Sequence, residues 1–256
     1  MKLYIIGAGP GDPDLITVKG AQLLKEADAI FYTDSLVNDE LIERYRKPEA
    51  EVFHTAGMHL EEMVEAMLEK LKQGKKVVRI HTGDPSIYGA TLEQIALLKK
   101  QGVEIEMVPG VSSVFAAAAA VQAELTVPDL TQTVILTRAE GRTPVPEKEK
   151  LEELAKHHCT LALFLSATLT KKVTKALKEA GWSDDTPVVV VYKATWPDEK
   201  IVYSTVGTLD EDMRENGIRK HALILAGWAL DPAVIEREYR SKLYDKTFTH
   251  GYRRGV

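Results

Sequence analysis

The chain alternates short strand-like runs with amphipathic helical patterns, and this alternation restricts its fold more than any other feature. In the first half, the runs rich in β-branched or aromatic residues are LYIIG, AIFYT, VFHT, KVVRI and VEIEMV. The clearest helical stripe covers residues 60–71, and Gly74 is placed to end it. A similar stripe at residues 92–100 stops before Gly102. Strands that alternate with helices predict a mostly parallel sheet with helices on both faces.

A second series of strand-like runs follows in the other half of the chain. Its members are TVILTR, TLALFLS, PVVVVYKA, KIVYSTVG and HALILAG, and the helical segments EKEKLEELAKHH and LTKKVTKALKEAG separate the first three. Only the short, turn-like WPDE segment joins PVVVVYKA to KIVYSTVG. A connection this short favours an antiparallel hairpin, because parallel neighbours need a long crossover. The second half is therefore predicted to hold a mixed sheet.

The predicted fold class is α/β, with two α/β domains. The first domain covers residues 1–116, a helix or linker covers 117–126, and the second domain covers 127–230. The alanine-rich run at the junction is predicted to be a packed helix, because alanine is the best helix former. The tail at 231–256 is basic and aromatic without clear periodicity, and it is either a frayed end or an arm that docks on a partner subunit or a ligand.

Composition excludes several classes of function. The 256 residues are 45% hydrophobic and 28% charged, and the net charge of −5 offers no basic field for a nucleic acid. The single cysteine, Cys159, rules out an internal disulfide and a multi-cysteine metal site. We predict that its thiol is packed in the protein and that the chain has no metal site. A lone cysteine also fits a reducing compartment, so we predict a cytoplasmic location. No apolar run reaches the ~18 residues that span a bilayer, and we expect neither a membrane partner nor a signal peptide.

The first glycine-rich loop, GAGPGDPDL, departs from a dinucleotide-binding turn. Pro10 has no amide hydrogen with which to hold a phosphate, and Asp12 stands where the third fingerprint glycine is expected. The loop is therefore a weak match to a nucleotide fingerprint. Two interpretations remain: a tight turn needed for backbone geometry alone, or a loop for a small ligand of another kind.

Two further loops follow predicted strands, where ligands bind in open parallel sheets. In HTGDPSIYGA, the polar groups of Asp84, Ser86 and Tyr88 stand beside the apolar Ile87, a mixture that suits an adenosine or amino-acid ligand. In VPGVSSV, the serines are candidates to cap the helix that follows.

Taken together, GAGPGDPDLIT, YTDSLV, HTGDPSIYG and VPGVSS strongly resemble, in order and spacing, the motifs of the tetrapyrrole (corrin/porphyrin) methylase family. The resemblance continues through ALFLSAT, YKATWPDEKIVYSTVGTL and HALILAGWAL, to residue 230. It implies a homodimer that binds S-adenosylmethionine in a cleft between two α/β domains, methylates a tetrapyrrole and releases S-adenosylhomocysteine.

The motif HTGDPSIYGA is similar to the corresponding motif in the branch of the family that methylates carbon 11 of cobalt-precorrin-4 in anaerobic cobalamin biosynthesis. Methylation of another ring position, and metal-free precorrin-4 as the substrate, are alternatives that the sequence leaves open. From a different class, a nicotinamide- or flavin-dependent oxidoreductase built on GAGPG is the alternative.

The resemblance also implies which residues contact the cofactor. Carried over position by position, the implied cofactor-binding residues are Pro10, Thr82, Gly83, Asp84, Ile87, Ser112, Ser113, Leu165, Ala194 and Ala226.

For catalysis, the resemblance implies Asp34 as a residue of the active cleft, with His54 as the second candidate. Asp34 could equally cap a helix in SLVNDELIERY. Relatives that methylate uroporphyrinogen carry a lysine near His54, which this chain lacks, so a shared acid–base scheme is not implied. His54, His59 and His81 all follow predicted strands, and ordinary loop residues are the alternative for each.

A substrate with several carboxylates needs basic side chains at its binding site, because the chain as a whole is acidic. The available side chains are Arg44, Arg46, Arg79, Arg138, Arg142 and Lys193, and nothing in the sequence separates them.

Overall fold

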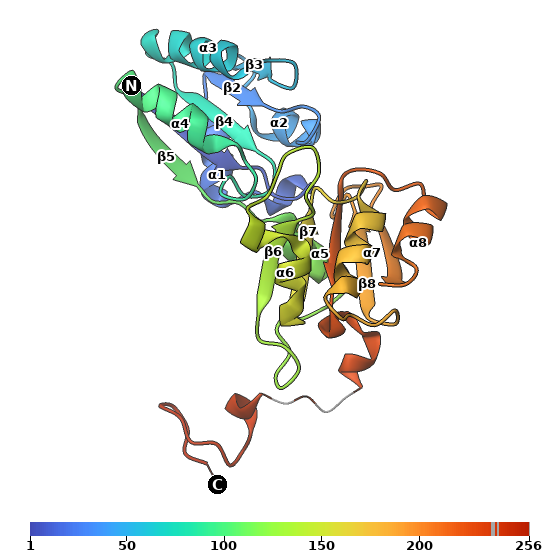
Figure 1. The fold of residues 1–256 in the computed structure, drawn as a ribbon. Coiled ribbons are helices and arrows are strands. Elements are labelled where there is room, and N and C mark those ends of the chain that lie inside the picture. Colours follow the sequence, from blue (N-terminus) through green and yellow to red (C-terminus); the bar gives the residue numbers. More distant parts are fainter. Residues whose placement is uncertain (237–238, 240, 256) are drawn as a thin grey trace. The chain divides into compact units, whose positions relative to one another are not determined.

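The computed structural model describes residues 1–236, 239 and 241–255, and these form two compact units (Figure 1). The first unit comprises Met1–Ala116 and Ala194–Asp198, and the second comprises Ala117–Lys193 and Glu199–Val256. The boundary falls inside helix α5 (Ser113–Ala120), which is the predicted alanine-rich helix. The segment 194–198 groups with the first unit although it lies far along the chain.

The first unit is built on a five-stranded sheet in the order β3-β2-β4-β1-β5, with all neighbours parallel. Its strands are β1 (Lys2–Gly7), β2 (Ala29–Tyr32), β3 (Glu51–His54), β4 (Val77–His81) and β5 (Glu104–Val108). All five were predicted from the sequence. Because the strands are parallel, their carboxyl ends meet at one edge of the sheet.

Helices cover both faces of this sheet, as the alternating pattern predicts. Its helices are α1 (Val18–Glu26), α2 (Asp39–Tyr45), α3 (Leu60–Lys72) and α4 (Thr91–Lys100). Leucines and isoleucines of α1 and α2 pack against one face, and Met67 of α3 and Leu98 of α4 pack against the other. Gly74 and Gly102 follow α3 and α4 with φ of 75° and 74°, which is the left-handed geometry expected of a glycine that ends a helix.

The second unit contains a mixed five-stranded sheet in the order β6-β7-β10-β8-β9. Its strands are β6 (Val134–Arg138), β7 (Thr160–Phe164), β8 (Pro187–Tyr192), β9 (Lys200–Thr205) and β10 (Ala222–Ala226). Only β6 and β7 pair in parallel, and β8 and β9 form the predicted antiparallel hairpin. The expectation of one parallel and one mixed sheet is therefore confirmed.

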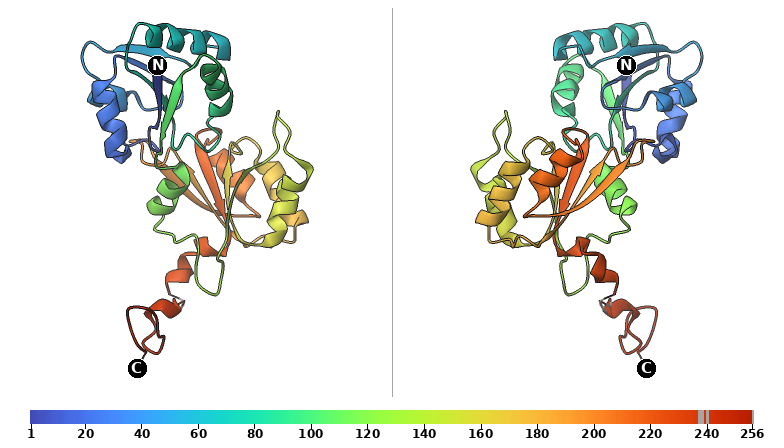
Figure 2. Two further views of the ribbon diagram at one scale, coloured as in Figure 1. Left: turned by 90° about the vertical axis from the view of Figure 1, so that its left-hand side faces the viewer. Right: turned by 90° about the vertical axis from the view of Figure 1, so that its right-hand side faces the viewer.

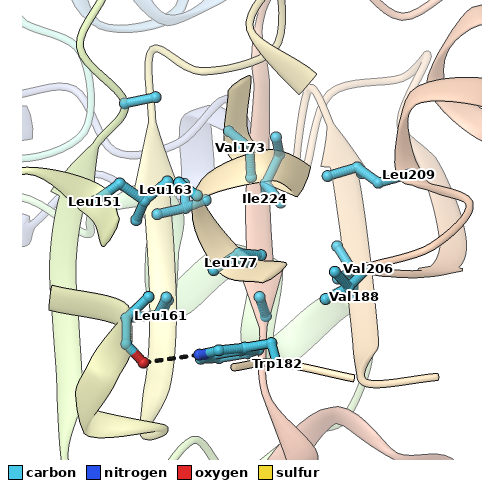
Figure 3. Packing of buried hydrophobic residues seen from close by; sticks show 14 of the residues in the cluster. Leu151, Leu161, Leu163, Val173, Leu177, Trp182, Val188, Val206, Leu209 and Ile224 are labelled. Carbon is cyan, nitrogen blue, oxygen red and sulfur yellow. Dashed lines mark hydrogen bonds between the residues drawn. The ribbon is translucent and has the colours of Figure 1, made fainter. Parts of the chain in front are cut away.

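The core of the second unit lies between this sheet and helices α6 (Leu151–Leu154), α7 (Thr170–Glu179) and α8 (Leu209–Glu215), and α6 and α7 stand on one side of the sheet in Figure 2. Figure 3 shows Val173 and Leu177 of α7 over the strands, with Trp182 at the end of the cluster. The indole N–H of Trp182 donates to the Ala155 carbonyl oxygen at 2.7 Å, so this large buried ring keeps a hydrogen-bond partner. Cys159 is buried in the same core, and burial raises the pKa of its thiol, which confirms the packed-thiol prediction.

Some element boundaries differ from the sequence-based expectation. The segment EKEKLEELAKHH is not one helix: α6 has only four residues, and 3₁₀ turns at Glu147–Glu149 and Ala155–His157 flank it. His158 ends it in a left-handed conformation with φ of 48°. Apolar spacing alone could not distinguish a continuous helix from a chain of short turns.

The predicted tail at 231–256 lies partly outside the described residues, since positions 237, 238, 240 and 256 are not described. Its described part contains short 3₁₀ turns at Pro232–Ile235 and Lys242–Tyr244. Within the described ranges, no helix has the length and apolar character that crossing a bilayer requires.

Candidate active site

Three glycine-containing loops meet at the carboxyl edge of the first sheet, after strands β1, β4 and β5. They approach so closely that side chains are excluded. A Cβ added to Gly7 would lie 2.5 Å from the Gly110 Cα atom and 2.5 Å from the Gly83 carbonyl oxygen. A Cβ added to Gly110 would lie 2.1 Å from that same oxygen. Gly7 and Gly110 are therefore required by contact between the loops.

Backbone hydrogen bonds join the first two loops. Gly9 and Gly83 form an isolated antiparallel bridge, in which the Gly83 N–H donates to the Gly9 carbonyl at 2.9 Å. The Ala8 N–H donates to the His81 carbonyl at 2.7 Å. Gly9 and Gly83 have φ of 80° and 60°, which non-glycine residues adopt at a cost.

Asp84 joins the second loop to the third. Its carboxylate accepts the Gly110 N–H at 2.9 Å and the Ser86 N–H at 2.9 Å, and the Ser86 hydroxyl also donates to it. Burial favours the neutral acid, but the hydrogen bonds from Ser86 and Gly110 outweigh it, and the pKa of Asp84 is lowered. Asp84 is thus a fixed anion that holds two loops in register.

The other predicted residues of these loops differ in exposure. Thr82 is exposed, Ile87 and Ser113 are half-buried, and Ser112 is buried. The Ser112 carbonyl accepts the backbone N–H groups of Phe115 and Ala116, so Ser112 starts α5 through its backbone. Thr82 and Ile87 are thus accessible at this edge of the sheet, and their contact with a ligand stays a prediction.

The first loop is also held by the segment 194–198. The Trp196 indole N–H donates to the Pro10 carbonyl at 3.0 Å, and the Asp12 N–H donates to the Thr195 hydroxyl at 2.9 Å. Ala194, another predicted cofactor-binding residue, is buried beside them in this segment. Sequence reasoning missed Trp196 and Thr195, because more than 180 positions separate them from the loop that they contact.

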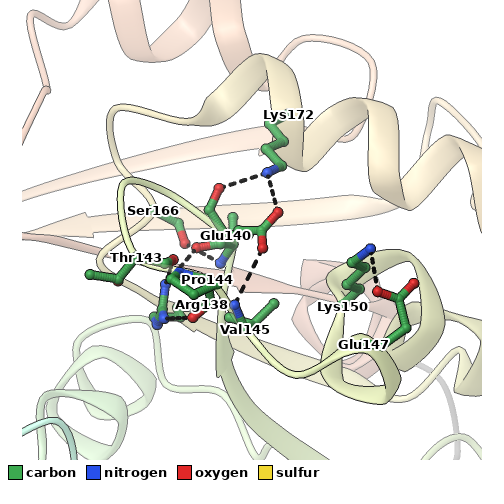
Figure 4. Close-up of polar contacts among 10 residues, drawn as sticks. Arg138, Glu140, Thr143, Pro144, Val145, Glu147, Lys150, Ser166 and Lys172 are labelled. Carbon is green, nitrogen blue, oxygen red and sulfur yellow. Dashed lines mark hydrogen bonds and ion pairs between the residues drawn. The ribbon is translucent and has the colours of Figure 1, made fainter.

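Leu165 follows β7 in the second unit and adopts an unusual conformation. It is 67% exposed and has φ of 51°, a left-handed value that is rare for a large apolar residue. The neighbouring Ser166, labelled in Figure 4, is fully buried. Its hydroxyl donates to the Phe164 carbonyl at 2.7 Å and accepts the Ala139 N–H at 2.9 Å. Strained residues persist where the surroundings enforce them, and they cluster at functional sites.

The turn that follows β6 is fixed near this point by charged side chains. Arg138 donates to the carbonyls of Thr143 and Pro144 at 3.2 and 2.8 Å, and Lys172 pairs with Glu140 at 3.3 Å (Figure 4). The hydrogen bond from the Val145 N–H, followed by that from Lys172, lowers the pKa of Glu140. Arg138 therefore supports its own loop.

Ala226, the last predicted cofactor-binding residue, lies at the end of β10. Its side chain is fully buried in the hydrophobic core of the second unit. A ligand at this position would have to meet its backbone rather than its methyl group.

The two predicted catalytic residues lie together, Asp34 in the loop after β2 and His54 at the end of β3. The Asp34 carboxylate accepts the Ala56 N–H at 3.3 Å, and it lies 3.9 Å from Nδ1 of His54. Their side chains are 38% and 60% exposed. The imidazole of His54 also contacts the ring of Tyr32, with 5.1 Å between ring centroids.

The alternative assignment of Asp34 as a helix cap is wrong. Helix α2 begins at Asp39, and Asn38 caps it by accepting the Glu40 N–H at 3.1 Å. The Asn38 amide also donates to the Gly11 carbonyl at 3.1 Å, which ties the start of this helix to the glycine loop. Asp34 is therefore free of the capping role and faces the surface beside His54.

The remaining candidate histidines have structural surroundings. His59 caps α3 by accepting the Glu62 N–H at 3.3 Å. His81 is buried at the end of β4, and its Nε2 atom has no hydrogen-bond partner in the described part of the chain. Burial, with the nearby charge of Arg79, lowers the pKa of His81 to about 3.

The chain that forms this arrangement is similar to known proteins. A model of the Tetrapyrrole (Corrin/Porphyrin) Methylases matches residues 2–210. The chain belongs to the tetrapyrrole methylase family. A relative from Priestia megaterium, named cobalt-precorrin-4 C(11)-methyltransferase, is 73% identical over all of this chain and 99% of its own.

Solved structures of tetrapyrrole methylases share the fold. An X-ray structure of cobalt-precorrin-4 methyltransferase covers 90% of this chain and 96% of its own, with a TM-score of 0.89 and 73% identity. The uroporphyrin-III C-methyltransferase of Thermus thermophilus, solved with S-adenosylhomocysteine, has a TM-score of 0.75 and 27% identity. It covers 90% of this chain and 94% of its own.

The contact between loops predicts a large penalty for one methyl group in this tetrapyrrole methylase. Gly110→Ala is expected to lower the free energy of unfolding by about 3 kcal/mol, because its Cβ meets backbone that cannot withdraw. Chemical denaturation of the full chain measures the loss. Gly57→Ala is the matched control, since nothing lies within 4 Å of its added Cβ. Equal stability of the two variants would contradict the described packing.

The burial of His81 predicts a pH dependence. The unfolded chain takes up a proton near pH 6.5, whereas folded His81 stays neutral until about pH 3. The unfolded state therefore binds more protons in this range, and stability falls as the pH falls, by at most about 1.4 kcal/mol per pH unit from this group. The His81 ring proton should show no NMR titration between pH 8 and 5, and His81→Gln should remove this part of the slope. A midpoint near pH 6.5 would contradict the burial.

Proposed function

We propose that this chain transfers a methyl group from S-adenosylmethionine to carbon 11 of cobalt-precorrin-4. The observation that carries the proposal is the 73% identity, along the entire chain, to a methyltransferase named for that reaction. The Thermus thermophilus relative solved with S-adenosylhomocysteine supports the choice of methyl donor. A homodimer, which the family resemblance implies, and a cytoplasmic location, which the single cysteine suggests, remain parts of the proposal.

The loops of the first unit fit such a donor better than a dinucleotide. Pro10 offers no N–H, and the N–H groups of Gly9 and Asp12 already donate to the Gly83 carbonyl and the Thr195 hydroxyl, so this loop has few donors left for a pyrophosphate. Asp84 instead places a fixed negative charge at the sheet edge, which suits a sulfonium cation. This combination argues against the nicotinamide- or flavin-dependent alternative.

We assign donor binding to the residues at the meeting of the three loops and the 194–198 segment. In the first unit these are Pro10, Thr82, Gly83, Asp84, Ile87, Ser112, Ser113 and Ala194. Leu165 and Ala226 belong to the second unit, and their contact with the donor stays a prediction from the family resemblance.

The chemistry requires alignment more than acid–base catalysis. S-adenosylmethionine supplies a methyl group on a positively charged sulfur, and the departing thioether needs no proton. The residues of the site then have to hold the methyl group and the ring carbon about 3–3.5 Å apart, in line and away from water. Asp34 and His54 are assigned to the acceptor side, where they orient the ring.

Isotope labelling tests the proposal. Incubation with cobalt-precorrin-4 and S-adenosylmethionine labelled with ¹³C in its methyl group should give one labelled product, with the label on carbon 11 by NMR. Metal-free precorrin-4 serves as the matched alternative acceptor and should react more slowly. Isothermal titration should show binding of S-adenosylhomocysteine and none of NADH. A label on another carbon, or binding of NADH alone, would refute the assignment.

A further inference from the structure

Arg79 is a buried cation in the centre of the first sheet. It lies on β4, the middle strand, and is 4% exposed. No carboxylate of the described residues pairs with it, and burial lowers its pKa to about 10. An unpaired buried charge costs several kcal/mol in folding free energy, so its retention calls for a functional explanation.

The guanidinium is held by the hydroxyl groups of the residues that directly follow β2 and β3. Its Nη1 donates to the Thr55 hydroxyl oxygen at 3.0 Å, and its Nη2 donates to the Thr33 hydroxyl oxygen at 3.1 Å. The two hydroxyls lie 3.1 Å from each other. On the helix side, Nε donates to Gln94 at 3.4 Å. The planar fork thus spans both threonines at once, which a lysine ammonium cannot match.

Both threonines adjoin the predicted catalytic residues. Thr33 directly precedes Asp34, and Thr55 directly follows His54. The register explains the convergence: Phe31 of β2 pairs with Arg79 and with Phe53 of β3. Thr33 and Thr55 lie two residues beyond these phenylalanines, on the same face of the sheet and towards its carboxyl edge.

The exposed side chains of Asp34 and His54 have few restraints of their own. Their pairing distance is 3.9 Å, and a backbone bond to Asp34 comes from Ala56, the residue after Thr55. Their placement therefore depends on how firmly the ends of β2 and β3 are held. We propose that Arg79 is a positioning residue, which fixes Asp34 and His54 for the methyl acceptor through the hydroxyls of Thr33 and Thr55.

The other arginines available to the acceptor have different surroundings. Arg44 pairs with Asp14 at 2.6 Å and Arg46 pairs with Glu43 at 3.0 Å, both at the surface. Arg138 donates to carbonyls of its own turn. Among these four, Arg79 is the one that joins the two strands carrying the predicted catalytic pair.

This inference rests on the proposed function, and variants of the full chain test it. Arg79→Met should lower kcat/KM for cobalt-precorrin-4 by about 10- to 100-fold, because misplacement by about 1 Å is enough for such a loss. Arg79→Lys should recover part of it. The Kd of S-adenosylhomocysteine should change by less than about threefold, since the Arg79 side chain donates to Thr33 and Thr55, after β2 and β3, and not to the donor loops.

If Arg79→Met does not fold, variants of the two threonines can still test the positioning role of Arg79. Thr33→Val and Thr55→Val each remove one hydroxyl that the guanidinium donates to, while Arg79 itself is kept, and each should lower kcat/KM. Thr55→Val also removes the 3.0 Å hydrogen bond from the Thr55 hydroxyl to the Tyr32 carbonyl, so Thr33→Val is the cleaner variant. Combined with Arg79→Met, Thr33→Val should add little further loss, because the two groups act as one unit. Thr160→Val is the matched control: it removes a buried 2.8 Å hydrogen bond to the Leu125 carbonyl in the second unit and should leave kcat/KM unchanged.

The outcomes separate the two proposals. Wild-type kcat/KM in Thr33→Val and Thr55→Val would overturn the positioning role, as would equal losses of kcat/KM and of S-adenosylhomocysteine affinity. Failure of the wild-type chain to methylate cobalt-precorrin-4 would instead refute the proposed function.

Discussion

The close contact of three backbones at the carboxyl edge of the first sheet is the constraint on which the site depends. Strand β1 pairs with both β4 and β5, so the loops that follow these strands must occupy adjoining space. They fit because Gly7 and Gly110 carry no side chains, while Gly83 supplies the left-handed turn between them with φ of 60°. Asp84 then fixes the separation of two of the loops by accepting the Gly110 N–H. The glycines and the aspartate of the motifs are thus explained by packing before any ligand is considered.

Electrostatics divides this edge into two regions. Near the glycine loops, hydrogen bonds lower the pKa of Asp84 and leave a fixed anion, which suits a cationic donor. Beneath Asp34 and His54 lies the buried positive charge of Arg79, in a chain whose net charge is −5. An anion in the loop after β4 and a cation buried within β4 can orient a cationic donor and an acidic acceptor at one sheet edge.

Much of the fold could be predicted from the sequence because it is encoded locally. All ten strands and helices such as α3 and α7 follow from β-branched runs and apolar spacing. The predictions failed where the same residues were compatible with more than one local structure. The segment around α6 has helical spacing but forms short turns, and Asn38 rather than Asp34 caps α2.

The candidate site was only partly accessible to sequence reasoning. The motif loops could be identified from their order and spacing, whereas the contacts that support them join distant positions. Trp196 reaches Pro10, and Arg79 reaches Thr33 and Thr55, only after the strands have paired. Among six candidate basic side chains, burial singled out Arg79, and no local pattern carried that information.

The most direct test of the central claim is a crystal structure with S-adenosylhomocysteine bound. The account predicts that the ligand lies against the meeting point of the glycine loops, in contact with Gly83, Asp84 and Ile87. A ligand bound elsewhere, with these loops free of it, would contradict the account.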